Sequence, residues 1–320
     1  VAGWSLAYAR FMHTGQFASA RAVEVGAHFE RFLADPAQQV FWQSLFLLST
    51  LVVITLGVRR GLGLMVWLAV PALVAMLAFL VKFGLDNGDM VAAQEFLFST
   101  RPVDFTTQSV LVALGHAFYT LGVGVGTGII YGAYAPQRVP IGRSVMAVAV
   151  FDIMIALLAG LAIFPIVFAN NMEPSAGPGL MFISLPFAFG NIMQGEMFGT
   201  VFFLLVVLAA LGSAVAIMEP IVAALMQFTR ITRVTATVLV GTLVWGLGLA
   251  VVLSFSRGLD IDWFGYNNLF SFLDHLATDI LLPLVSLLIA LFVGWRMRPE
   301  IVRLVLDRES GVFFSLWYFL

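Results

Sequence analysis

The sequence predicts an all-α integral membrane protein, and three observations lead to this fold class. The 320 residues are 61% hydrophobic and 11% charged, with a mean hydropathy of +1.01, whereas soluble domains carry about 25% charged residues. Apolar stretches long enough to cross a bilayer recur along the chain. The basic residues between these stretches fall on alternate sides of the membrane. Because so few charges cannot cover a water-facing surface, soluble enzymes and nucleic-acid-binding proteins are excluded.

Eight stretches reach the length of about 20 mostly apolar residues that a helix needs to cross the hydrocarbon core. The expected spans are residues 1–19, 40–58, 62–83, 108–134, 144–169, 197–228, 234–256 and 270–295. Glycine and proline interrupt the apolar residues 170–196, where we expect an extracellular helical hairpin rather than a further span. The chain starts inside one apolar stretch and stops as another opens. We therefore interpret residues 1–320 as a single transmembrane domain, truncated at both ends.

The short loops predict the orientation, since lysine and arginine stay on the cytoplasmic side. One set of loops holds ten basic residues against three acidic ones, namely Arg59, Arg60, Arg138, Arg143, Arg230, Arg233, Arg296, Arg298, Arg303 and Arg308 against Glu300, Asp307 and Glu309. The opposite set holds eleven acidic residues against five basic ones. A wrong number of spans would disrupt this alternation. We expect a multi-pass protein of the cell (inner) membrane.

Charged residues within spans are costly, so each is a functional candidate. The expected spans contain Arg10, Asp152, Glu219, Asp274 and Asp279. Asp152 has no charge of either sign near it in the sequence, so it either coordinates a cation or is a protonated or hydrogen-bonded structural group. Glu219 precedes Pro220, whose ring frees a backbone carbonyl one turn back. We expect a structural role for Glu219.

Four glycines stand at every second position of one span, at residues 122, 124, 126 and 128. Each glycine costs about 1 kcal/mol in a helix interior, so four within seven residues favour a broken helix. Broken helices near the midplane expose N–H and C=O groups that bind carboxylates and alkali ions. The alternative is a stripe of small residues for close helix packing, because Gly122/Gly126 and Gly124/Gly128 also repeat at every fourth position.

A second small, partly polar face lies in LAALGSAVAIMEP, where Ala209, Gly212, Ser213 and Ala216 follow helical spacing. Close helix packing explains such a face, and the Ser213 hydroxyl could equally offer a hard oxygen ligand to sodium. The sequence contains no HExxH motif, no paired aspartate motif and no nucleophile elbow. We therefore do not expect an enzyme.

Three segments, taken together, resemble a known family. GHAFYTLGVGVG followed by IIYGAY, then DIMIALLAGLAIFPIVF, then ALGSAVAIMEP are similar to the sixth, seventh and eighth helices of the neurotransmitter:sodium symporter family, in its bacterial amino-acid transporter branch. The resemblance covers nearly the whole chain. It implies a LeuT-type inverted-repeat helical bundle, of which this chain covers roughly helices three to ten. The first two helices would lie upstream of Val1 and would be needed to complete the site.

The resemblance also implies two sodium sites. Thr120 and Asp152 match ligands of the first ion, through hydroxyl, carbonyl and carboxylate oxygens. Ala209, Gly212 and Ser213 fall on the second ion's site. Gly212 has no hydroxyl, so a carbonyl or a water replaces it or this site is weakened. The sodium stoichiometry therefore stays open.

The substrate-binding residues implied by the resemblance lie on the sixth and eighth helices: Tyr119, Thr120, Gly122, Val125, Ser213 and Ile217. Tyr119 takes the aromatic lid position, and the small residues at 122 and 125 leave room for a bulky apolar or aromatic amino acid. Asp274 matches the acid of the extracellular gate. Ala156 stands where relatives carry an acid or a chloride-binding serine, which predicts chloride-independent transport.

The function implied is sodium-coupled symport of an amino acid across the lipid bilayer by alternating access. The alternatives are a sodium-independent amino-acid exchanger and a non-transporting sensor on the same fold. The expected ligands are sodium ions and the amino acid, and no nucleic-acid partner is expected.

Overall fold

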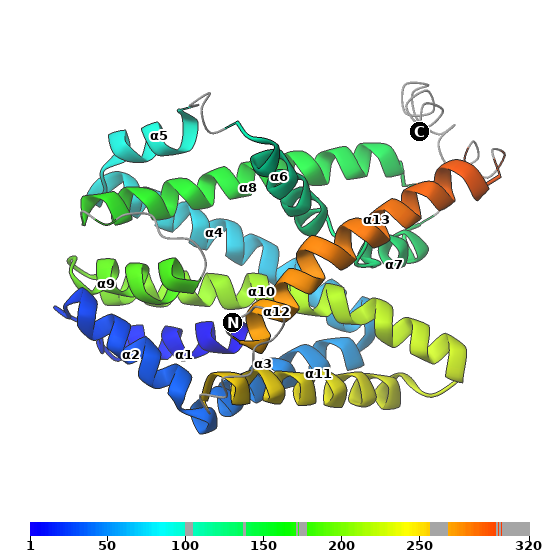
Figure 1. The fold of residues 1–320 in the computed structure, drawn as a ribbon, viewed down its shortest axis with the longest axis horizontal. Helices are drawn as coiled ribbons and strands as arrows, with labels where there is room; N and C mark the ends of the chain where they lie inside the picture. The colour runs from blue at the N-terminus through cyan, green and yellow to red at the C-terminus, as the bar shows by residue number, and fades with distance from the viewer. Residues whose placement is uncertain are drawn as a thin grey trace. The chain divides into compact units, whose positions relative to one another are not determined.

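The computed structural model describes residues 1–99, 105–136, 139–170, 172, 178–256, 268–298, 300 and 302. Within these residues the chain forms α-helices and short π-helical turns, with no strand (Figure 1). The chain divides into two compact units, Val1–Ser99 with Leu157–Leu269 and Thr100–Ala156 with Phe270–Leu320. We call them unit 1 and unit 2 and describe each by itself.

Unit 1 holds the longest helices. Its elements are α1 (Ala2–His13), α2 (Ala22–Ala34), α3 (Pro36–Thr55), η1 (Val58–Leu62), α4 (Gly63–Asn87), α5 (Met90–Phe98), η3 (Leu180–Ser184), α9 (Leu185–Gly190), α10 (Gly195–Thr229) and α11 (Arg233–Ser256). Unit 2 holds α6 (Thr107–Thr120), α7 (Thr127–Tyr134), α12 (Leu269–His275, from Phe270 on), η4 (Leu276–Leu281), α13 (Leu282–Leu291) and η5 (Phe292–Arg296). The long helix α8 (Ile141–Ala169) contributes its first part to unit 2 and, from Leu157 on, its second part to unit 1.

Six helices in the described residues are long and apolar enough to cross a membrane. They are Pro36–Thr55, Arg60–Asn87, Ile141–Ala169, Gly195–Thr229, Arg233–Phe255 and Leu269–Arg296, and each corresponds to an expected span. Two expected spans differ. In residues 1–19 the helix α1 has 12 residues, and residues 108–134 are divided between α6 and α7.

The helices begin where the sequence supplies caps. Asp35 accepts hydrogen bonds from the N–H groups of Ala37 and Gln38 at 3.0 and 3.2 Å, and Pro36 occupies the first turn of α3, where its missing N–H costs nothing. Thr106 caps α6 by accepting from the N–H of Ser109 at 3.1 Å. Each cap satisfies N–H groups that the helix itself leaves without partners.

An aromatic core holds unit 1 together at one end. Tyr8, which is fully buried, contacts rings from the α1–α2 turn, α2, η3 and α10, and Phe17 and Phe182 are among them at centroid distances of 5.6 and 5.0 Å. The Trp4 indole donates to Gln39 Oε1 at 3.3 Å, and Gln39 Nε2 donates to the Leu33 carbonyl at 2.6 Å. These two hydrogen bonds connect α1 to the junction of α2 and α3. Aromatic rings bury large areas with defined geometry, so they fix how these helices pack.

The described part of segment 170–196 packs on this core. η3 and α9 form one helical stretch from Leu180 to Gly190, and Phe182, Leu185 and Phe189 are buried. Its end is joined to the α1–α2 turn, since Ser19 N–H donates to the Gly190 carbonyl at 2.9 Å. Residues 171 and 173–177 lie outside the described residues, so the expected hairpin stays a prediction.

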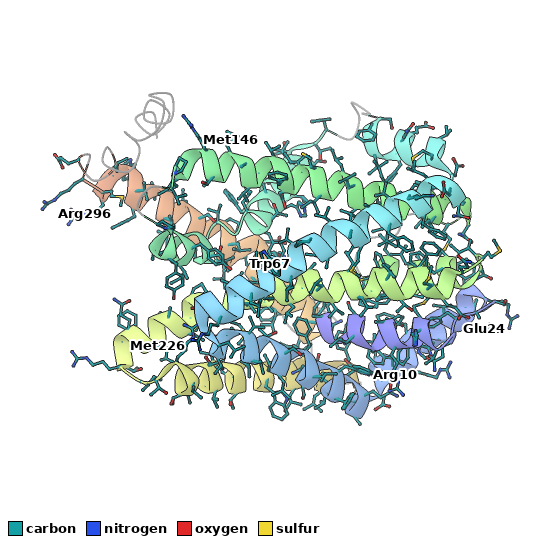
Figure 2. All side chains as sticks on the ribbon, turned by 180° about the vertical axis from the view of Figure 1, so that it is seen from behind. Arg10, Glu24, Trp67, Met146, Met226 and Arg296 are labelled. Carbon is teal, nitrogen blue, oxygen red and sulfur yellow. The ribbon has the colours of Figure 1, made fainter. Side chains whose placement is uncertain are left out.

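The outward faces of the long helices are apolar. Trp67 of α4 is 73% exposed (Figure 2), and valines and leucines line the exposed faces of α4 and α11. A water-soluble protein rarely exposes contiguous apolar surface of this extent, whereas a lipid-facing helix requires it.

Candidate functional site

The run of alternating glycines breaks a helix, as the glycine cost predicts. α6 ends at Thr120 and α7 begins at Thr127, and residues 121–126 form turns (Figure 1). Gly122, Gly124 and Gly126 have φ angles of +66°, +89° and +87°, in the left-handed region that only glycine adopts at little cost. A Cβ on Gly128 would meet no described atom within 4 Å. The break, rather than a packing stripe, therefore explains this pattern.

The break gathers four of the six predicted substrate-binding residues. Tyr119 and Thr120 end α6, while Gly122 and Val125 lie in the turns. Thr127 Oγ1 donates to the Gly122 carbonyl at 3.2 Å, and Val123 N–H donates to the Phe118 carbonyl at 3.0 Å. These bonds hold the turn, and Tyr119 is 53% exposed beside it.

The first predicted sodium site has both of its ligands in unit 2. Thr120 lies at the C-terminal end of α6, where its Oγ1 donates to the Ala117 carbonyl at 3.3 Å. Asp152 lies on α8, half-buried, and makes no hydrogen bond or ion pair within the described residues. The role of Asp152 as a sodium ligand, like its structural alternative, stays a prediction.

The second predicted sodium site lies on α10, in unit 1, as do the substrate-pocket residues Ser213 and Ile217. Ser213 Oγ donates to the Ala209 carbonyl at 3.3 Å, so two of the three predicted ligands are in direct contact. A Cβ on Gly212 would meet only the Met65 methyl, at 3.9 Å. Residue 212 therefore has space for a side chain or a water where the hydroxyl is missing.

Glu219 forms a buried ion pair that the sequence did not reveal. Its side chain is 2% exposed, and Arg233 Nη2 at the start of α11 approaches Glu219 Oε2 to 2.5 Å. Arg233 Nε also donates to the Ile54 carbonyl at the end of α3, at 2.7 Å. The pair thus connects α3, α10 and α11, which agrees with the structural role expected for Glu219. In the distribution of charges between loops, Arg233 is only one of the basic loop residues.

The predicted gate residue lies next to a second pair of ionisable groups. Asp274 is exposed near the end of α12, and its carbonyl accepts from Thr278 Oγ1 at 2.7 Å. His275 Nδ1 lies 2.7 Å from Asp279 Oδ2 in the π-helical turn η4. The structure therefore gives Asp279, a charge within an expected span, a local partner.

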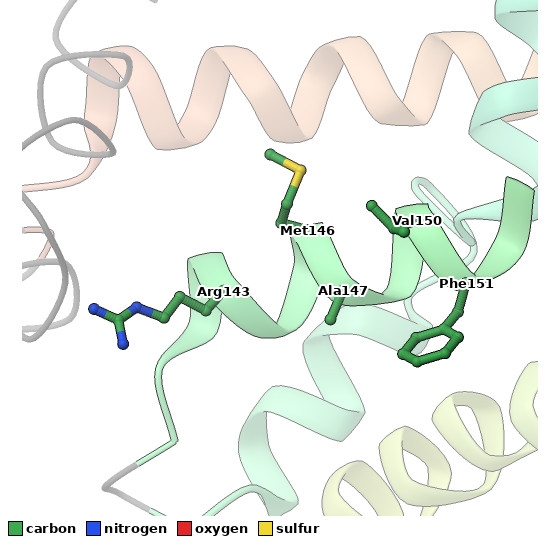
Figure 3. A pocket seen from close by; sticks show the side chains of 5 residues that line it. All are labelled: Arg143, Met146, Ala147, Val150 and Phe151. Atoms are coloured by element: carbon green, nitrogen blue, oxygen red, sulfur yellow. The ribbon is translucent and has the colours of Figure 1, made fainter. Parts of the chain in front are cut away.

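Two cavities are lined by other residues than those predicted for the site. One of about 420 Å³ lies along α8 and is lined by Arg143, Met146, Ala147, Val150 and Phe151 (Figure 3). Another, of about 580 Å³, lies in unit 1 where the α1–α2 turn meets the α9–α10 turn. Neither lining contains a predicted site residue.

The sequence and the fold of this chain are both similar to those of known proteins. Residues 27–318 match the sequence model of the sodium:neurotransmitter symporter family. The chain belongs to this family. Two sodium-dependent transporters described as uncharacterized are among its relatives: YhdH of Bacillus subtilis is 30% identical over all of this chain, and a Haemophilus influenzae protein is 29% identical over 89% of it. The chain spans 71% and 62% of their respective lengths.

This symporter family member also has a close structural counterpart. The crystal structure of MhsT in complex with L-phenylalanine superposes with a TM-score of 0.89 at 36% identity, covering 99% of this chain and 72% of MhsT. The predicted LeuT-type helical bundle and the multi-pass membrane location are confirmed. The family and fold are those of transporters and not of enzymes.

Proposed function

We propose that this chain forms the larger part of a sodium-coupled amino-acid symporter that works by alternating access. The observation that carries the proposal is the break between α6 and α7, which places Tyr119, Thr120, Gly122 and Val125 together with backbone groups released from the helix. Such breaks bind carboxylates and alkali ions in secondary transporters. Membership of a sodium symporter family supports the same function.

In this proposal sodium is a co-transported substrate held by oxygen atoms. Thr120 and Asp152 serve one ion, and Ala209 and Ser213 serve another, with Gly212 contributing no side-chain ligand. Hard cations prefer such oxygen ligands. Each charge that enters across 100 mV supplies about 2.3 kcal/mol. Sodium and amino acid together favour the closed state, because each binds that state better than the open one.

The proposed amino acid is bulky and apolar or aromatic. Small residues at 122 and 125 leave room beside the lid Tyr119. The similarity to MhsT, solved with L-phenylalanine, supports this class of substrate. We further propose that two helices preceding Val1 complete the site, that transport is independent of chloride, and that Asp274 serves the extracellular gate. Uptake after replacing chloride with gluconate tests the chloride proposal, which a loss of uptake would contradict.

The decisive experiment is a thermal-shift panel of the twenty amino acids, in sodium and then in potassium buffer, on the transporter carrying the family's first two helices. A ligand at 100 times its Kd stabilises the folded state by about 2.7 kcal/mol. A shift only in sodium supports coupled binding, and Asp152→Ala should then remove the sodium dependence. No shift with any amino acid would contradict the proposal.

One observation favours a second candidate, a sodium-independent exchanger. Gly212 supplies no hydroxyl to the second ion. An equal thermal shift in both buffers would favour the exchanger, and binding without accumulation in proteoliposomes would favour a sensor.

A further inference from the structure

A buried serine lies directly behind the helix break. Ser286 of α13 is 4% exposed, and α13 packs against α6 within unit 2. A Cβ built on Gly124 would lie 2.7 Å from Ser286 Oγ and 2.9 Å from the Leu282 carbonyl. The turn therefore rests on α13 at Gly124 with no space for a methyl group.

The Ser286 hydroxyl differs from most hydroxyls on the described helices, and it shares its lack of a hydrogen-bond partner with the buried hydroxyls of Tyr8 and Thr237. Ser49, Ser144 and Ser213 donate to the carbonyl four residues earlier at 2.9, 2.8 and 3.3 Å, which is the usual arrangement for serine within a helix. Ser286 Oγ has no hydrogen-bond partner among the described residues, although it is buried. A buried hydroxyl without a partner is costly, so its position against the turn calls for a reason.

We propose that Ser286 is a positioning residue for the broken helix and that its contact with Gly124 sets which side-chain sizes the substrate pocket accepts. The inference rests on the proposed function. Because α13 occupies one side of the turn, a substrate that contacts Gly122 and Val125 approaches from the other side. The Ser286 side chain limits how far the turn can retreat from that substrate.

Through this contact, a change in the volume of the side chain at residue 286 shifts the turn and so changes the size of the pocket. A bulkier side chain at residue 286 has no free space at Gly124, so the turn moves away from α13 and the pocket narrows. Removing Oγ lets the turn move toward α13 and widens the pocket. One methylene in an apolar pocket changes discrimination by roughly tenfold or more, so displacements of this size should be measurable.

The test compares the Kd of L-tryptophan, a large probe, with the Kd of L-valine, a small one, on the transporter in sodium buffer. Ser286→Val should raise the Kd ratio of tryptophan to valine roughly tenfold, and Ser286→Ala should lower it. Ser286→Cys adds less volume than Ser286→Val and should raise the Kd ratio by a smaller factor. It serves as the test if Ser286→Val does not fold. Ala290→Val is the matched control, because it adds the same branching at an exposed position of α13 and should leave the ratio unchanged.

The outcomes separate this inference from the proposed function. If the unmodified transporter binds no amino acid in the full panel, the proposed function fails and the inference fails with it. If the unmodified transporter binds both probes but the Ser286 variants change both Kd values equally, or match Ala290→Val, the proposed function stands. Ser286 would then be a packing residue with no influence on specificity.

Discussion

The buried pair of Glu219 and Arg233 should be a main determinant of how α3, α10 and α11 stay together. We predict that Arg233→Met lowers the free energy of unfolding by about 3–5 kcal/mol, the usual cost of removing one member of a buried ion pair. Glu219 is 2% exposed and its carboxylate lies 2.5 Å from the guanidinium, so solvent cannot replace the lost contact. The Ile54 carbonyl also loses its donor, which adds about 1 kcal/mol.

A double-mutant cycle separates these contributions. Glu219→Leu with Arg233→Met removes both charges, and replacing a buried pair by apolar residues is often close to neutral. We therefore expect the double variant to be more stable than Arg233→Met alone and to retain a loss of about 1 kcal/mol from the Ile54 carbonyl. The measurement is unfolding in a denaturing-detergent titration.

The matched control is an ion pair that water reaches. Lys82 and Asp86 form an i,i+4 pair at 2.9 Å whose side chains are 75% and 59% exposed. Lys82→Met should cost no more than about 0.5 kcal/mol. The reasoning is refuted if Arg233→Met is no more destabilising than Lys82→Met, or if the double variant is as unstable as the sum of its single variants.

Three further predictions concern the break, the second sodium site and the helix α2. Gly126→Ala should cost about 1–2 kcal/mol, because its φ of +87° is left-handed, and should weaken amino-acid binding. Gly128→Ala, at a helical position with open space, should instead stabilise the protein by up to about 1 kcal/mol. Thermal unfolding and amino-acid binding of the two variants are compared, and equal effects of Gly126→Ala and Gly128→Ala would argue against the break. Gly212→Ser should increase the sodium dependence of binding, since Met65 leaves space for the new side chain, and an unchanged sodium titration would place the second ion elsewhere. Burial lowers the pKa of His28 below its unfolded value near 6.5. The stability that neutral His28 contributes is therefore fully present above pH 6.5 and is lost as the pH falls through the folded pKa. Replacing His28 with Asn should flatten the dependence of the unfolding free energy on pH between pH 8 and 5.

Much of the candidate site could be predicted from local sequence. Alternating glycines weaken a helix, because the cost arises within each residue's own backbone. The position of the break, and the clustering of Tyr119, Thr120, Gly122 and Val125 beside it, follow from this local preference. The choice between a break and a packing stripe needed the φ angles and the open space at Gly128.

The tertiary contacts of Ser286 and Arg233 have no signal in the sequence. Ser286 is a lone hydroxyl in the apolar run LPLVSLLIAL, and nothing in that run indicates that it faces Gly124. Arg233 looks like any cytoplasmic loop arginine, yet it reaches a buried carboxylate on the preceding helix and a carbonyl of α3.

The difference between the features that the sequence predicts and those that it does not has a physical basis. Membrane class, most of the spans and the position of the break depend on the hydrophobicity and backbone freedom of residues within a few positions of one another, so composition and order were enough. Partners for polar groups depend instead on which helices lie side by side in the fold. Only the folded arrangement pairs Glu219 with Arg233 and places a buried hydroxyl behind the turn at Gly124.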